Sequence, residues 1–315
     1  MNNITRYAAT IIAPATRPYT SGEWRYLDFC RLHRLEASPT PDLIISSFAA
    51  YLTRFVKPGT IRAYLSAVRN LHIELGIPDP FLDTPLLQRV MRGICRVHGT
   101  AVEKTRLPVT MPVLKGLIHA LQSSQAYTAH DKAMLSAAML LAFFGFLRCG
   151  EFTAPASKHH LDGAECGDVK ISLQPPSLPF FLKHSKTDPE KRGMTIHIGS
   201  ATPPVCPVIA MITYFSLSPA LPSDPLFKFQ DGSPLHRARF VDIVRKLLVA
   251  VGVHNQDHYA GHSFRIGAAT TAALCGTPEW MIRAMGRWRS DCVHCYIRTA
   301  PTMLQAVSAQ MAAVH

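Results

Sequence analysis

Long hydrophobic runs are missing from this sequence of 315 residues. The longest apolar stretch, residues 134–147, is interrupted by Ser136 and is shorter than the ~20 residues that a membrane-spanning helix needs. The first 18 residues contain no basic segment followed by a sustained apolar one, so neither a secretory signal nor a membrane anchor is predicted. We therefore expect the protein to remain inside the cell.

Motifs for several kinds of catalytic or metal site are also missing. A Gly-rich phosphate-binding loop and a paired-carboxylate metal motif are both absent, which argues against an NTPase and a two-metal nuclease. Cys292 and Cys295 flank His294 as zinc ligands could, but no second cysteine pair stands at a suitable spacing. The eight cysteines are irregularly spaced, and we expect reduced thiols rather than disulfides. We predict no metal site and no cofactor.

The composition is that of a globular protein with an excess of positive charge. Hydrophobic residues make up 48% and charged residues 17%, which excludes a wholly disordered or collagen-like chain. At about 150 residues per domain, the length predicts two domains. Lys and Arg number 33 against 21 Asp and Glu, a net charge of +12. This charge favours a polyanionic partner, either nucleic acid or an anionic membrane.

The first hundred residues have the pattern of amphipathic helices. Apolar residues recur every three or four positions over residues 44–55, which predicts one helix with a buried face. Pro58 ends this pattern, and Thr60 is a suitable N-cap for the next helix. A third helix is predicted to begin at Thr84, which is followed by a proline at the first helical position. A polar segment over residues 101–110 then predicts a linker.

Basic residues line the outer faces of the second and third of these helices. They are Arg62 and Arg69 on the second helix and Arg89, Arg92 and Arg96 on the third. Such stripes can lie against the phosphates of DNA, but a solvated helix face explains them equally well.

The chain beyond residue 110 has a mixed pattern. It predicts a buried helix over residues 131–147 and a small antiparallel sheet from strands at 168–173, 179–183 and 194–198. Eleven of the 24 prolines fall between residues 155 and 225, which we interpret as long loops around that sheet. Further helices are predicted over 238–251, 264–274 and 278–285, with a last turn or helix over 290–296. The predicted fold class is mainly α with a small antiparallel β-sheet.

Cationic side chains stand where they could bind an anion. Arg148 closes the buried helix, where the helix dipole alone would favour a cation, and Glu151 could orient its guanidinium. His262 and Arg265 are three residues apart in a predicted helix, so they share a face and can present an imidazole and a guanidinium to one anion. Lys186 lies between two predicted strands, where a hairpin tip would project it toward a ligand or into solvent.

These motifs, in this order, resemble the tyrosine recombinase (phage-integrase) family of DNA strand transferases. The resemblance rests on Arg148, Glu151, Lys186, His262, Arg265 and, near the end of the chain, Tyr296. The Gly286-Arg287-Trp288 sequence and the string around Lys186 look most like the recombinases of eukaryotic DIRS-like, Ngaro and crypton mobile elements.

The resemblance implies a domain plan and a partner. Residues 1–16 would be an N-terminal extension, 17–100 a helical core-binding (SAM-like) DNA-binding domain and 111–315 the catalytic domain. The partner would be double-stranded DNA, bound by a homo-tetramer, in the nucleus if the host is eukaryotic. A membrane partner loses support because the informative cations surround one tyrosine instead of forming a polybasic cluster.

One position departs from the family pattern. Most of the family has His or Trp nine residues before the nucleophile, whereas this chain has Arg287 there and Trp288 one residue later. Either Arg287 supplies a third guanidinium to the phosphate, or Trp288 packs beside Tyr296.

The implied chemistry suits these residue types. Attack on a phosphodiester builds negative charge that Arg148 and Arg265 can stabilise through bidentate hydrogen bonds. Tyr296 would be the nucleophile, His262 would accept its proton, and Lys186 would protonate the departing 5′ oxygen. The product is a 3′-phosphotyrosyl intermediate that a 5′-hydroxyl can reverse, as integration or excision requires. A type IB topoisomerase-like enzyme and a domesticated, non-catalytic DNA-binding protein are the alternatives.

Overall fold

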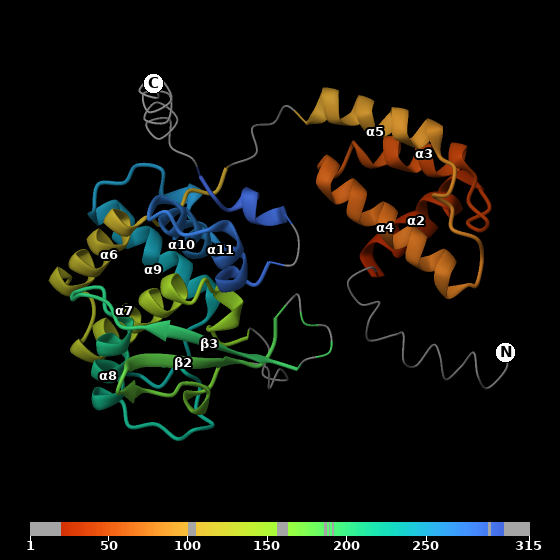
Figure 1. The fold of residues 1–315 in the computed structure, drawn as a ribbon. Helices are drawn as coiled ribbons and strands as arrows, with labels where there is room; N and C mark the ends of the chain where they lie inside the picture. Colours follow the sequence, from red (N-terminus) through yellow and green to blue (C-terminus); the bar gives the residue numbers. More distant parts are fainter. Residues whose placement is uncertain are drawn as a thin grey trace, which may run out of the picture. The chain divides into compact units, whose positions relative to one another are not determined.

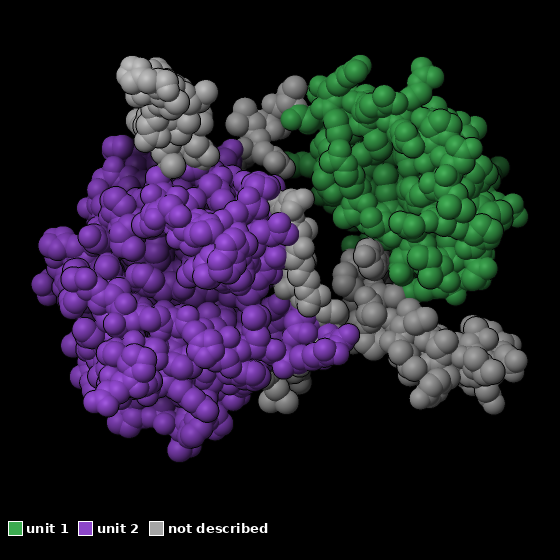
Figure 2. Space-filling model, viewed as in Figure 1, with its two compact units in different colours: residues 1–103 green, residues 104–315 purple. Residues whose placement is uncertain are grey.

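The computed structural model describes residues 20–99, 105–155, 163–185, 188, 190, 192–288 and 291–298. The chain divides into two compact units, residues 1–103 (unit 1) and residues 104–315 (unit 2), as Figure 2 shows. Each unit has its own hydrophobic core. No helix in the described part of the chain is long and apolar enough to cross a membrane.

Unit 1 contains four described helices (Figure 1): α2 (Thr20–His33), α3 (Asp42–Leu52), α4 (Pro58–Glu74) and α5 (Pro85–His98). Its core is aromatic and aliphatic, and includes Tyr26, Phe48, Ile61, Leu65 and Ile94. Helices α2 and α4 approach each other closely at Gly22, where a Cβ atom would lie 2.7 Å from the Cβ of Ala67. A larger residue there would push the two helices apart.

The helix boundaries in unit 1 follow capping chemistry. Helix α4 begins at Pro58, two residues before the predicted cap, because a proline at the first helical position has no N–H to leave unpaired. Phe55, predicted to be buried, lies beyond the end of α3 and is 50% exposed. Helix α5 begins after Thr84 as predicted, and the Asp42 carboxylate accepts two backbone N–H groups of its first turn at 2.9 and 3.0 Å.

Unit 2 is built around one buried helix. This is α7 (Ala129–Phe144), whose residues 133–143 are all buried. The helices α8 (Pro207–Leu217) and α10 (Ser263–Leu274) pack against it, and α6 (Met111–Ser123) packs against α9 (Arg237–Ala250). Helix α11 (Glu279–Gly286) and the 3-10 helix η4 (Asp291–Cys295) follow α10. The remaining 3-10 helices are η1 (Cys149–Glu151), η2 (Cys166–Asp168) and η3 (Gln256–His258).

A three-stranded antiparallel sheet lies against α8 in unit 2 (Figure 1). Its order is β1 (Ser172–Leu173), β2 (Pro176–Leu182) and β3 (Met194–Gly199), and Leu182 pairs with Met194 at the loop end of the β2–β3 hairpin. The predicted fold class, mainly α with a small antiparallel sheet, is confirmed. Strand β1 begins four residues later than predicted, since residue 168 belongs to the 3-10 helix η2 and residues 169–171 are not part of the strand.

Helix α8 was not predicted, since prolines surround its start. Pro203, Pro204 and Pro207 suggested a loop, but Pro207 occupies the first helical position, which tolerates proline.

The predicted linker is attached to unit 2 in its second half. The N–H of Leu107 donates to the carbonyl of His258 at 3.1 Å, and that of Val109 donates to the carbonyl of Ser263 at 2.9 Å. Val109 is fully buried, and a Cβ atom at Gly267 of α10 would overlap its carbonyl oxygen. This segment therefore packs directly on the first turns of α10.

Candidate active site

Unit 2 contains a cavity of about 470 Å³ where several predicted site residues meet. Arg148 and Glu151 reach it from the end of α7, His262 from the start of α10, and Tyr296 from the end of η4. The wall is completed by Cys149, Gly150, His184, Ser185, Arg237 and Gly261. Side chains that are distant in sequence are thus gathered around one opening.

Arg148 is held by Glu151 within one turn of η1. Helix α7 ends at Phe144, earlier than predicted, because the chain turns sharply at Phe146, whose φ is 50°. The Glu151 carboxylate then accepts the backbone N–H and the Nη1 of Arg148, both at 2.8 Å. Glu151 is only 6% exposed and Arg148 18%, so the pair fixes a guanidinium at the cavity wall.

Arg265 is buried close to Tyr296 and does not line the cavity. Its side chain is fully buried, and it donates to the carbonyl of Phe146 at 2.7 Å and to the carbonyl of Gly286. Burial, reinforced by the neighbouring guanidiniums, lowers the pKa of Arg265 to about 10, which still leaves it protonated at neutral pH. Arg148 therefore reaches the cavity, whereas the guanidinium of Arg265 is enclosed by protein.

His262 precedes α10 as its N-cap residue and lines the cavity. The imidazole is exposed at the cavity, yet its surroundings remove part of its hydration. This desolvation, together with the positive charges of Arg148, Arg237 and Arg265, lowers the pKa of His262 below the usual 6.5. The imidazole is therefore neutral at neutral pH and can accept a proton.

Trp288 packs directly against Tyr296. Their ring centres are 4.8 Å apart with the planes inclined by 46°. The guanidinium carbon of Arg265 lies 4.5 Å from the centre of the Trp288 ring and 5.5 Å from that of Tyr296. Gly286 makes this packing possible, because a Cβ atom there would overlap the Trp288 ring. The sequence left open whether Arg287 binds the phosphate or Trp288 packs beside Tyr296. The structure has Trp288 packed there.

Arg287 does not line the cavity beside Tyr296, although it contacts Glu151, which does. Its side chain is 5% exposed, and its Nη2 donates to Glu151 at 2.8 Å and to the carbonyl of Phe146 at 3.2 Å. Its Nη1 donates to the carbonyls of Gly145 at 3.0 Å and Met285 at 3.4 Å. All of these acceptors are protein groups.

Lys186 lies outside the described residues. Its neighbour Lys183 is paired with Glu165 at 2.7 Å and with Asp168 at 3.1 Å. His184 lines the cavity. The hairpin that carries Lys186 therefore starts beside the site.

Known proteins resemble this chain in sequence and in fold. It is 25% identical over 283 residues to an integrase/recombinase XerD homolog of Selenomonas ruminantium, covering 86% of this chain and 77% of that protein. No protein-family model matches it. These similarities support the tyrosine recombinase family.

Solved structures give the same fold at low sequence identity. The XerH site-specific recombinase bound to a palindromic difH substrate matches with a TM-score of 0.64 at 13% identity, over 98% of this chain and 83% of that one. The Tn1549 transposon integrase with transposon right end DNA matches with 0.59 at 14%, over 98% and 99%. A lambda integrase dimer bound to a core site matches with 0.55 at 15%, over 93% and 76%. The tyrosine recombinase fold therefore extends over both units.

Arg237 lines the same cavity, and the sequence analysis did not predict it. It begins α9, is exposed and lines the cavity, and it makes no hydrogen bond or ion pair with any described residue. Gly261 leaves room for it, since a Cβ atom there would lie 3.3 Å from the Arg237 Nε. A cation in the first turn of a helix opposes the helix dipole, and that conflict is the signal that could have found it.

The five basic residues predicted to bind DNA all lie in unit 1, on α4 and α5. Arg62 donates to the Cys95 sulfur at 3.2 Å, and Arg69 pairs with Asp79 at 2.5 Å. The other three, Arg89, Arg92 and Arg96, are exposed on α5.

A second basic cluster in unit 1 was not predicted. Phe55 packs on Tyr51 with the ring centres 5.1 Å apart, and the guanidiniums of Arg25 and Arg54 lie 5.2 and 6.0 Å from its ring centre. Neither arginine has a hydrogen bond or ion pair among the described residues. Cations close to an exposed aromatic ring are a combination found in single-stranded nucleic-acid sites, where the cations contact phosphates and the ring stacks on a base.

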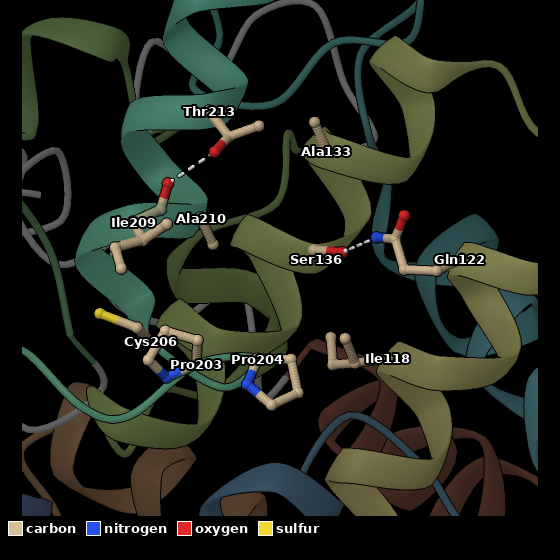
Figure 3. A pocket seen from close by; sticks show the side chains of 10 residues that line it. All are labelled: Ile118, Gln122, Ala133, Ser136, Pro203, Pro204, Cys206, Ile209, Ala210 and Thr213. Atoms are coloured by element: carbon tan, nitrogen blue, oxygen red, sulfur yellow. Dashed lines mark hydrogen bonds between the residues drawn. The ribbon is translucent and has the colours of Figure 1, made fainter.

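A smaller cavity of about 220 Å³ lies between α6, α7 and α8 (Figure 3). It is mostly apolar, and its polar side chains are already engaged: Gln122 donates to Ser136 at 3.1 Å, and Thr213 donates to the carbonyl of Ile209 at 2.9 Å. It contains none of the predicted site residues. Among the described residues, no group of three or more His, Cys, Asp or Glu side chains is placed to hold a metal ion, and all eight cysteines are free.

Proposed function

We propose that this protein is a site-specific DNA recombinase that cleaves and rejoins strands through a 3′-phosphotyrosyl intermediate. The observation that carries the proposal is the position of Tyr296. Its ring borders the cavity that is also lined by Arg148 and the neutral His262, and the guanidinium carbon of Arg265 lies 5.5 Å from the centre of that ring. A phenol, a proton acceptor and fixed positive charge are the groups that attack on a phosphodiester needs.

In the cleavage step, the Tyr296 oxygen attacks the phosphorus and a new O–P bond forms while the bond to the 5′ oxygen breaks. The phenol proton passes to His262. Lys186 supplies a proton to the departing 5′ oxygen, which leaves as a hydroxyl. Arg148 stabilises the charge that develops on the non-bridging oxygens, and Arg265 adds its field from its buried position.

The rejoining step runs the same chemistry in reverse. The 5′-hydroxyl of an incoming strand attacks the phosphotyrosyl phosphorus, and the Tyr296 oxygen leaves and regains its proton. Because the phosphodiester energy is kept in the intermediate, the exchange needs no nucleotide cofactor and no net hydrolysis. A recombinase that integrates or excises a mobile element needs this balance, and we assign that role to the chain.

Double-stranded DNA is the substrate that the charge distribution favours. Residues 1–105 carry 13 basic and 8 acidic groups, and residues 106–315 carry 20 and 13, so both units are positive. The XerH, Tn1549 and lambda proteins that share the fold were solved with DNA. We infer that unit 1 (core-binding) and unit 2 (catalytic) bind one duplex, and that four copies assemble on paired sites.

The test is covalent capture on a nicked suicide duplex that carries the terminal sequence of the element. We expect the wild-type protein to form a denaturation-resistant adduct, and peptide mapping to find the nucleotide on Tyr296. No adduct, or an adduct on another residue, would contradict the proposal. Relaxation of any supercoiled plasmid without a paired site would favour the topoisomerase-like alternative.

The basic face of α5 gives a prediction about DNA affinity. Arg89→Ala and Arg92→Ala should each weaken binding to all DNA sequences and reduce the slope of log K against log salt by about 0.9, because each removes one phosphate contact. Fluorescence titration at several salt concentrations measures the slope. Arg31→Ala is the control, since Arg31 is already paired with Asp28 at 2.6 Å on α2. Slopes equal to that of the control would place the face in solvent.

The lowered pKa of His262 gives a prediction about pH. The neutral imidazole is the proton acceptor, so cleavage should be constant at neutral pH and fall in acid with a midpoint below 6.5. Removing a neighbouring positive charge makes protonation easier, so Arg237→Met should raise this pKa and move the midpoint upward. Single-turnover cleavage across pH measures both profiles. A midpoint that does not move in Arg237→Met, or that persists in His262→Gln, would exclude His262 as the titrating group.

A further inference from the structure

We propose that Arg287 is a positioning residue, which holds Arg148, Arg265 and Tyr296 in place without touching the DNA phosphate. The inference rests on the recombinase function proposed above. It concerns the position where the family resemblance predicts His or Trp and where this chain has a cation instead.

Both Nη groups of Arg287 donate to protein acceptors, and its Nε is buried without a hydrogen-bond partner among the described residues. Four acceptors surround the guanidinium: one carboxylate oxygen of Glu151 and the carbonyls of Gly145, Phe146 and Met285. Arg287 does not line the cavity beside Tyr296. It borders a different cavity of about 550 Å³, between α11 and the end of the β2–β3 hairpin.

The backbone is bent to make this contact. Arg287 has φ 58° and Phe146 has φ 50°, and they are two of the three described non-glycine residues with positive φ. These two strained residues are joined by the hydrogen bond from Arg287 to the Phe146 carbonyl. A left-handed backbone conformation in residues with large side chains persists only where the surroundings hold it, and such residues concentrate at functional sites.

Arg287 is connected to the other site residues by shared partners. Glu151 accepts from both Arg148 and Arg287, and the Phe146 carbonyl accepts from both Arg265 and Arg287. The next residue along the chain is Trp288, which packs on Tyr296. The Arg287 side chain therefore fixes Glu151, which holds Arg148, and the Phe146 carbonyl, which accepts from Arg265. It also fixes the turn that carries Trp288, the residue packed on Tyr296.

Charge balance explains why a cation is useful here. Glu151 is nearly buried, and on its own it would neutralise Arg148, the guanidinium that reaches the cavity. Arg287 neutralises Glu151 from the other side at 2.8 Å, so the three groups together keep a net positive charge for the phosphate. Arg287 thus strengthens the action of Arg148 through the carboxylate.

The experiment is a double-mutant cycle between Arg287 and Glu151, read as DNA affinity and as single-turnover cleavage of the suicide duplex. Arg287→Met should slow cleavage by about 100-fold, the effect of misplacing reacting groups by about 1 Å, and leave DNA affinity unchanged. Arg287→Lys should recover part of the rate because it keeps the charge. The double variant with Glu151→Gln should be no slower than the slower single variant, since both changes break one contact. Lys246→Met is the control, an exposed residue of α9 paired only with Asp242.

Several results would overturn the inference. Multiplying effects in the double variant, or lost DNA affinity in Arg287→Met, would mean that Arg287 contacts the phosphate directly. Cleavage at the wild-type rate by Arg287→Met would mean that Arg287 is not a positioning residue. If Arg287→Met does not fold, Arg287→Lys and Glu151→Gln are used instead. Cleavage at the wild-type rate by both of these variants would overturn the inference. A wild-type protein that forms no adduct would refute the recombinase function itself, and the inference with it.

Discussion

Replacing Tyr296 with Phe is expected to abolish the covalent adduct with DNA while leaving DNA affinity unchanged. The substitution removes one oxygen atom, the one that would bond to phosphorus, and keeps the ring that packs on Trp288 and lies 5.5 Å from the Arg265 guanidinium. Denaturing gel electrophoresis after incubation with suicide DNA measures the adduct, and fluorescence anisotropy measures the affinity.

Tyr259→Phe is the matched control for this result. Tyr259 is buried in the same unit but does not line the cavity, so its variant should form as much adduct as the wild type. An adduct in Tyr296→Phe, or its loss in Tyr259→Phe, would show that the nucleophile lies elsewhere.

Replacing Arg265 with Met is expected to slow cleavage by about 10³-fold and to lower the free energy of unfolding by about 1–3 kcal/mol. The loss of activity follows from removing the fixed positive charge close to Tyr296. The loss of stability follows because the carbonyls of Phe146 and Gly286 lose a charged donor in a buried place. Single-turnover kinetics and urea unfolding measure the two effects.

Arg245→Met separates these two effects. Arg245 also donates to backbone carbonyls, those of Tyr259 at 3.0 Å and Asp257 at 3.4 Å, but it is not part of the cavity. Its variant should lose stability and keep its cleavage rate. Arg265→Lys should regain stability more than activity, since a lysine restores the charge without the planar fork. Equal cleavage by Arg265→Met and Arg245→Met would reduce Arg265 to a structural residue.

The sequence predicted which residues contribute to the candidate site better than how their side chains are arranged. Arg148, His262 and Tyr296 stand at characteristic spacings, and the cavity brings them together. Arg265 was expected to face the anion beside His262, because a helical spacing of three puts two residues on one face. The pattern cannot show that carbonyls from two other segments enclose its guanidinium.

The remaining differences have local physical causes. Helix α8 was hidden because its prolines read as loop residues, although one of them occupies the first helical turn. Arg237 stands one residue before the predicted helix over residues 238–251 and is the first residue of the observed α9, and nothing in the apolar periodicity marks it as part of a site. The roles of Arg287 and Trp288 depend on a left-handed turn that no apolar pattern encodes.

The partners of the two buried arginines have a consequence for how the protein can change over time. Arg265 and Arg287 donate mainly to main-chain oxygens of residues 145, 146, 285 and 286, and Glu151 is the one side-chain acceptor among them. A carbonyl oxygen survives replacement of its own side chain as long as the backbone path is kept. The binding geometry therefore depends on the course of the main chain, and a substitution keeps it only where the backbone is undisturbed, as at the exposed Met285 but not at Gly286, where a Cβ atom would overlap Trp288.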